Sequence, residues 1–235
     1  MLFRRLAIAS SLVVSALAAF TVVAVAAGGG FGPGTYSFKS HSANAFFGSF
    51  QKGGPPSPAW SVSVNQGLNS FKPEGGQRIV NDDTVVSLFE FDTLGHGGFG
   101  CFVVPDGDFT VSRDLDSASL HTTLTAGEAC PGSPTPVGGK GQAGGGGGNG
   151  GLVLPITLDV TWSSAGPVTT YQNSFSVSCL DYSIDGKSTN DSVTAQASGA
   201  NSALSGSFTS AFSSVDSTRG SLDIKGVPQS GCFAY

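Results

Sequence analysis

The feature of this sequence that most limits its possible folds is an apolar pattern that repeats every second residue. It is clearest from Leu152 to Trp162, where one set of alternating positions holds only Leu, Ile, Val and Trp. Because successive side chains of a β-strand point to opposite faces, such a run buries one face and exposes the other. The same period recurs around Trp60 and from Phe109 to Leu124, and Trp60 and Trp162 are predicted core residues. The pattern predicts an all-β chain.

The spacing of these runs and of turn residues predicts the architecture. Turns are expected at Gly95–Gly98, at Pro105–Gly107, near Asp116 and at Asp185–Gly186. Short strands separated by turns, without a helical stretch, favour a single antiparallel β-sandwich of about 9–11 strands, with a β-barrel as the alternative. The predicted strands are residues 35–47, 60–64, 84–93, 99–104, 108–115, 117–125, 152–162, 175–179, 193–200, 206–213 and 221–225. Pro155, which cannot donate to a ladder, is expected at a sheet edge.

The first 26 residues have the organisation of a secretory signal peptide. Arg4 and Arg5 precede an almost wholly apolar run from Leu6 to Phe20, and Ala24–Ala26 matches a small-x-small cleavage site. The alternative is an uncleaved membrane anchor, because residues 6–27 could span a bilayer. We expect cleavage near Ala26, a secreted protein that keeps no membrane contact, and one β-domain over residues 27–235.

Charge limits the partners of the mature chain. The sequence has 11 Lys and Arg and 16 Asp and Glu; without Arg4 and Arg5 nine basic residues remain, and the net charge is −7. Such a surface repels polyphosphates, and no run of Lys or Arg offers a local exception. The composition therefore argues against nucleic acid and leaves an extracellular glycan or protein as the expected partner.

The four cysteines are expected to form two disulfides. Cys101, Cys130, Cys179 and Cys232 make an even number in an exported chain, and none of them has the close spacing of a metal site. If residues 108–115 and 117–125 form a hairpin around Asp116, facing residues have numbers that add up to about 231. The pairing Cys101–Cys130 satisfies that sum and leaves Cys179–Cys232, although a bulge at Pro105–Gly107 would shift the register.

One segment breaks the strand pattern. Residues 131–151 contain three prolines and eleven glycines, and only Val137 and Ala143 among them could return apolar burial. Ordering such residues costs roughly 1–2 kcal/mol each, so the segment is expected to be a flexible loop. A phosphate-binding loop is not predicted, because Lys140 is followed by Gly141 and the GxxxxGK spacing is missing.

Motifs for covalent chemistry are missing from the sequence. His41, His96 and His121 do not form a metal-binding pair, and no GxSxG elbow accompanies His96–Gly98. No cofactor, metal or catalytic residue is therefore assigned. The carboxylates that could serve a hydrolase are Glu90, Asp92, Asp114, Asp116 and Asp159. Glu90 and Asp159 stand out because they lie inside predicted strands, where the simpler interpretation is a solvated sheet face.

Several short segments resemble a group of uncharacterised exported bacterial all-β proteins. They are Gly34–Ser40 with Ala43–Phe47, Asp108–Leu120, Leu158–Trp162 and Ala197–Gly199. The resemblance implies secretion and one β-domain, and supplies no active site. We therefore expect a secreted, non-catalytic binding or cell-surface protein. A carbohydrate-binding module and a carboxylate-dependent secreted hydrolase are the alternatives.

Overall fold

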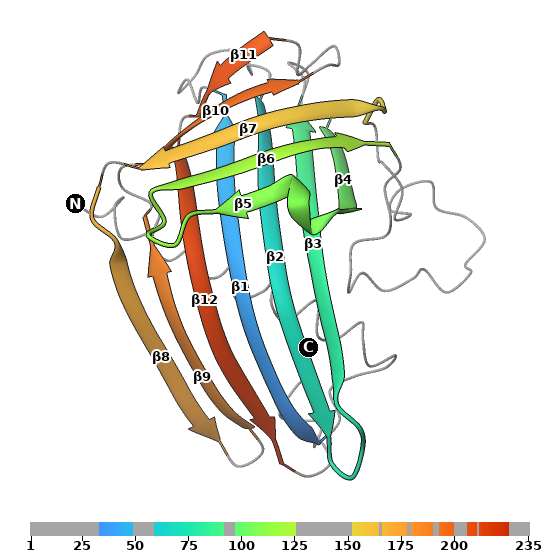
Figure 1. Cartoon of the computed structure of the whole chain (residues 1–235), viewed down its shortest axis with the longest axis vertical. Helices are drawn as coiled ribbons and strands as arrows, with labels where there is room; N and C mark the ends of the chain where they lie inside the picture. Colours follow the sequence, from blue (N-terminus) through green and yellow to red (C-terminus); the bar gives the residue numbers. More distant parts are fainter. Residues whose placement is uncertain are drawn as a thin grey trace.

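A computed structural model describes residues 33–48, 59–91, 97–125, 152–164, 166–177, 180–189, 193–199, 206–210 and 212–225. These residues form twelve strands in two antiparallel sheets (Figure 1). The seven-stranded sheet, here the long sheet, has the order β4 (Gly97–Val104), β3 (Ile79–Phe91), β2 (Ala59–Pro73), β1 (Gly34–Phe47), β12 (Phe212–Ile224), β9 (Leu180–Ser188) and β8 (Thr169–Val177). The five-stranded sheet, here the short sheet, has the order β11 (Gly206–Thr209), β10 (Val193–Gly199), β7 (Ile156–Ser164), β6 (Ser117–Leu124) and β5 (Phe109–Val111).

The two sheets pack face to face, and the predicted sandwich is confirmed. Each sheet keeps two open edge strands, so neither closes into a barrel. The main core lies between them and includes Val64 and Leu88 from the long sheet and Leu158 and Val160 from the short sheet. Both tryptophans are core residues as predicted, and the Trp162 Nε1 donates a hydrogen bond to the carbonyl oxygen of Asn44 at 3.0 Å.

The short sheet covers only part of the long sheet. In Figure 1 its strands cross in front of one end of β1, β2 and β12, and the other end of these strands extends beyond it. The change is visible along the inner face of β1, the face turned toward the short sheet. Ala43 is fully buried there, His41 is half-buried and Lys39 is exposed. We call the part of the long sheet beyond this boundary the open half.

The outer face of the open half carries a second apolar cluster. Tyr36 and Phe71 stack with their ring centroids 3.9 Å apart, and Leu180, Tyr182, Ile184, Leu222 and Ile224 are buried with them. Two glycines on this face lie under aromatic rings. A Cβ on Gly186 would lie 2.0 Å from Cζ of Tyr171, and a Cβ on Gly220 would lie 2.5 Å from Cζ of Phe38.

The turn predicted at Asp185–Gly186 is wrong. Both residues lie inside β9, where Asp185 pairs with Arg219 of β12 and Gly186 with Thr218. The Tyr171 ring occupies the place of a side chain at Gly186, so the glycine serves a close approach within a sheet instead of a turn. Because a turn was predicted at this position, β9 is missing from the predicted strands.

Three further expectations are corrected. Pro155 does not mark an edge strand, because β7 lies between β10 and β6 and begins only at Ile156, after the proline. Gly97 and Gly98, predicted in a turn, are the first residues of β4 and pair with Phe91 and Glu90. Residues 206–213 and 221–225, predicted as two separate strands, belong to β11 and to the single long β12.

The hairpin that suggested a disulfide pairing is shorter than predicted. It pairs Phe109–Val111 with Ala118–Leu120, so the numbers of two facing residues add up to 229 instead of 231. Before Phe109 the chain makes a single 3-10 turn and returns to β4 in the other sheet, so the register cannot be extended to Cys101. Cys101 is buried in β4, and the other three cysteines lie outside the described residues. The pairing Cys101–Cys130 therefore stays a prediction, without its hairpin argument.

Residues 1–26 and residues 131–151 also lie outside the described part of the chain. The predicted signal peptide and the predicted flexible loop therefore stay predictions. Within the residues that are described, no helix is long and apolar enough to cross a membrane.

Candidate functional site: a cationic cleft

A cleft of about 690 Å³ lies where the open half of the long sheet emerges from beneath the short sheet. The elements that line it are β1, β8, β9 and β12 of the long sheet and the turn between β5 and β6 of the short sheet. Its lining residues are Lys39, Arg113, Thr170, Tyr171, Gln172, Asp185, Gly186, Lys187, Ser217, Thr218 and Arg219.

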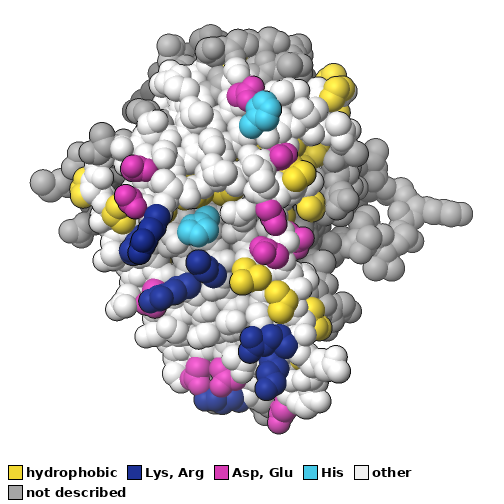
Figure 2. All heavy atoms as spheres, in the orientation of Figure 1, with side chains coloured by type: hydrophobic (Ala, Val, Ile, Leu, Met, Phe, Trp, Pro, Cys, Tyr) yellow, Lys and Arg dark blue, Asp and Glu magenta, His cyan; other side chains and the backbone are white. Residues whose placement is uncertain are grey.

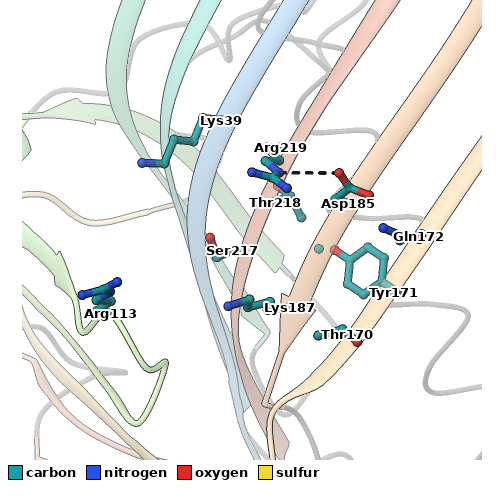
Figure 3. A pocket seen from close by; sticks show the side chains of 11 residues that line it. Lys39, Arg113, Thr170, Tyr171, Gln172, Asp185, Lys187, Ser217, Thr218 and Arg219 are labelled. Carbon is teal, nitrogen blue, oxygen red and sulfur yellow. Dashed lines mark ion pairs between the residues drawn. The ribbon is translucent and has the colours of Figure 1, made fainter.

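Four of the chain's 11 Lys and Arg residues meet at this cleft. Lys39, Lys187 and Arg219 come from β1, β9 and β12, and Figure 3 shows them projecting from the long sheet toward the side on which Arg113 lies. Figure 2 shows Lys and Arg side chains grouped on the same face of the molecule, below the short sheet. With Asp185 as the acid, the lining has a net charge of +3, in a chain whose net charge is −5.

The charges are set by the register of three neighbouring strands. Lys39 lies directly opposite Arg219, which lies directly opposite Asp185. Arg219 Nε is 3.5 Å from Asp185 Oδ2 (dashed in Figure 3), and the exposed geometry of this ion pair makes it worth at most about 1 kcal/mol. Like charges directly opposite on adjacent strands repel each other, so Lys39 and Arg219 destabilise the sheet where they meet. An anion bound between them would relieve this repulsion.

Arg113 is held over the cleft by a fixed turn. The turn between β5 and β6 is anchored by Leu115, which is only 1% exposed within the main core although its φ is +60°. Thr189 Oγ1 donates to the carbonyl oxygen of Leu115 at 3.2 Å, which ties the turn to the chain that leaves β9. The Asp116 carboxylate accepts hydrogen bonds from the hydroxyls of Ser112 and Ser117, and these bonds lower the pKa of Asp116.

His41 lies at the upper boundary of the cleft. It is directly opposite Ser217, which lines the cleft, and on the same face of β1 as Lys39. Its Nδ1 is buried and has no hydrogen-bond partner among the described residues. Burial and, to a lesser extent, the positive charge of Lys39 hold the pKa of His41 below its usual value of 6.5. The lowered pKa favours the neutral imidazole at pH 7.

Strand alternation separates the lining residues into two faces. Thr170, Gln172, Asp185 and Lys187 share the inner face with Lys39, whereas Tyr171 lies on the outer face, over Gly186. Burial raises the pKa of Tyr171 to about 12. The side chains that can meet a ligand in the cleft are therefore charged groups, hydroxyls and one amide.

Of the carboxylates named as hydrolase candidates, none that the structure describes lines this cleft. Asp159 alternates outward from the apolar row of β7, on the exposed face of the short sheet, where it forms an ion pair with His121. Glu90 shares the inner face of β3 with Val86 and Leu88 and is half-buried. Asp116 belongs to the β5–β6 turn, in which Asp114 is exposed, and Asp92 lies outside the described residues. The core separates Glu90 from Asp159, so they cannot act as a pair on one substrate.

Two acids at the predicted Pro105–Gly107 turn have structural partners. Asp106 and Asp108 belong to the 3-10 turn, where Asp106 Oδ1 accepts from the Thr84 hydroxyl at 2.7 Å and Asp108 Oδ2 from the Thr122 hydroxyl at 2.8 Å. Among the described residues, no group of three or more His, Cys, Asp or Glu could hold a metal ion.

Sequence reasoning missed the cationic cleft. Its four basic residues are at least 32 positions apart along the chain, so no run of Lys or Arg in the sequence indicates the cleft. They meet only because β12 pairs with both β1 and β9, and because the β5–β6 turn crosses the inner face. A weak signal was present, since Lys39, Lys187 and Arg219 occupy solvated alternating positions within strands.

No protein-family model matches the sequence, and no curated protein matches it. The likeness to exported bacterial β-proteins therefore stays an expectation, and the function is argued from the cleft.

Proposed function

We propose that this protein is a non-catalytic binding protein that holds an anionic ligand in the cationic cleft. The observation that carries the proposal is the meeting of Lys39, Arg113, Lys187 and Arg219, from four separate segments, around one hollow in an acidic protein. Carboxylate and sulfate oxygens accept the charge-assisted hydrogen bonds that ammonium and guanidinium groups donate.

The lining also favours binding over chemistry. The ammonium groups of Lys39 and Lys187 and the guanidinium group of Arg113 are exposed, and such groups donate hydrogen bonds to an anion. Asp185, the one acid among the lining residues, forms an ion pair with Arg219. The lining therefore has no pair of carboxylates to supply an acid and a base to one substrate.

The test compares anion binding by the full secreted chain and by charge-matched variants. Isothermal titration with inorganic sulfate and with a tricarboxylate should show binding that weakens as NaCl rises. Lys39→Gln and Lys187→Gln should each weaken it about tenfold, the cost of one charge-assisted hydrogen bond. Arg78→Gln removes one charge from the exposed β2–β3 turn and should leave the affinity unchanged.

The same variants separate a binding defect from a folding defect. Because Lys39 faces Arg219, the Lys39→Gln variant should unfold at the same temperature as the wild type or slightly above it without ligand. Equal affinity in wild type, Lys39→Gln and Lys187→Gln would refute the proposal.

We also propose that the protein is secreted after cleavage near Ala26 and carries two disulfides. The support is the organisation of residues 1–26 and the even number of cysteines. N-terminal sequencing of the exported protein tests the cleavage. Peptide mapping without reduction distinguishes Cys101–Cys130 with Cys179–Cys232 from the other two pairings.

A further inference from the structure

We infer that the ligand of the cleft is a linear acidic polysaccharide that lies across the strands of the open half. This inference rests on the proposed function and assigns the ligand class. It is carried by what surrounds the four cations on the inner face of the long sheet.

A row of five serines runs across the sheet next to the cations. The register places Ser70, Ser37, Ser221, Ser183 and Ser174 directly opposite one another on β2, β1, β12, β9 and β8. Ser37 is two residues from Lys39, so the row shares the face of the cleft. Four of the five are exposed, and Ser70 is half-buried.

The dimensions of this surface suit an extended chain. Neighbouring strands lie about 4.8 Å apart, so five strands give a row of hydroxyls roughly 19 Å long. The charged row that contains Lys39, Arg219 and Asp185 runs parallel to it, about 7 Å away along the strands. A ligand lying across the strands would meet cations along one edge and hydroxyls along the other.

The row on the far side of the serines is mixed in charge. Lys72, Thr35, Asp223 and Asp181 lie opposite one another in it, and Lys225 forms an ion pair with Asp181. Its two acids and two bases cancel, whereas the lining of the cleft has a net charge of +3. The acidic groups of the ligand are therefore expected on the side of Lys39, Lys187 and Arg113, and its hydroxyls over the serine row.

The chemistry of the row favours a saccharide over other anions. A serine hydroxyl both donates and accepts hydrogen bonds, which matches the hydroxyls of a sugar. No residue that lines the cleft has an aliphatic side chain; Leu68, opposite Lys39, and Val80, opposite Ser70, are exposed at the other end of the two rows. The inner-face rows described above contain no aromatic ring on which a nucleic-acid base could stack.

The experiment measures how affinity depends on ligand length and on the serine row. Oligouronides of one to six residues are titrated into the full chain, beside their methyl esters and a single-stranded oligonucleotide of equal charge. Affinity should rise from the monomer to about the tetramer, and esterification should abolish binding. Ser183→Val and Ser221→Val should each weaken tetramer binding about 3- to 10-fold and leave the single uronic acid unaffected. Ser163→Val, at an exposed strand position on the outer face of the short sheet, is the matched control.

The outcomes separate this inference from the proposed function. If small anions bind and require Lys39 and Lys187, but affinity does not depend on length or on Ser183 and Ser221, the polysaccharide assignment is wrong and the proposed function stands. Tighter binding of the oligonucleotide than of the oligouronide would also overturn the assignment. If no anion binds, both fail.

Discussion

At the scale of single residues, position on a strand decides which ionisable groups can respond to a ligand. His41 and His121 both lie in strands, yet their surroundings differ. His121 is exposed on the short sheet, and its hydrogen bond to Asp159 raises its pKa. His41 is half-buried at the edge of the cleft, and burial lowers its pKa. A bound anion would favour protonated His41, so anion binding and proton uptake are linked.

Anion affinity is therefore expected to rise as the pH falls, because a bound anion favours the protonated His41 that burial disfavours in the free protein. Protonation adds a positive charge next to Ser217 and Lys39, and the anion offsets the cost of burying it. Titration of a sulfated ligand, whose own charge is constant, between pH 7.5 and 5 should show tighter binding at pH 5. His41→Gln should flatten this dependence, whereas His121→Gln should keep it. A flat profile in the wild type would contradict the prediction.

The same group has the opposite effect on stability without ligand. The unfolded chain binds a proton at His41 below pH 6.5 and the folded chain resists it, so this contribution to stability is lost as the pH falls. His121 works in reverse, since its raised pKa favours the folded state at low pH. Chemical denaturation from pH 7.5 to 5 should show a smaller loss of stability for His41→Gln than for the wild type.

The role of a side chain could be predicted from the sequence only where it depends on that side chain's own strand. The alternation around Trp162 and Asp159 assigned the core and solvated positions of β7 correctly. The partnership of Lys39, Arg219 and Asp185 could not be predicted, because it depends on which strands are neighbours. Alternation fixes the sheet face on which a side chain lies. It does not indicate which strands pair when they are far apart in the sequence.

At the scale of strands, two features fix the shape of the cleft: the smooth course of β9 and the rigid turn between β5 and β6. Gly186 lets the Tyr171 ring lie against the backbone on the outer face, which keeps Asp185 and Lys187 aligned on the inner face. This arrangement also explains why a dipeptide typical of turns lies inside a strand. The turn signal was genuine as a local preference, but the packing of Tyr171 outweighed it.

Gly186→Ala is expected to destabilise the protein. The new Cβ would lie 2.0 Å from the Tyr171 ring, so the ring must leave its place on the sheet. We expect a loss of about 1–3 kcal/mol, typical of overpacking, measured by chemical denaturation. The double variant with Tyr171→Ala should lose less than the sum of the two single changes. Additive losses would show that the ring and the glycine are not coupled.

The β5–β6 turn should depend on one buried side chain. Leu115→Ala removes its anchor from the core and should cost about 2–5 kcal/mol of stability. Because Arg113 is carried by the same turn, anion affinity should also fall at temperatures where the variant is folded. Arg113→Gln provides the comparison, since it should lower affinity and leave the unfolding temperature unchanged. Unaltered affinity in both variants would exclude Arg113 from the site.

At the scale of the whole molecule, the sandwich joins a covered region that holds the core to an open region that holds the binding surface. The fold class could be predicted because period-two patterns and frequent turns are local properties. The unequal lengths of the two sheets could not, since they depend on β12 being one strand of 13 residues. The cleft exists only where the long strands extend past the short ones.

The central place of β12 has a consequence for the timing of folding. Its ladder with β1 joins residues 166 to 190 positions apart, from Phe46–Phe212 to Gly34–Ile224. Contacts so distant along the chain make folding slow, because a long loop must close before any of them forms. The long sheet also cannot be completed from its N-terminal strands alone, since β9 and β8 join it through β12. During synthesis from the N-terminus, the complete sandwich can therefore form only after the last strand of the chain has been made.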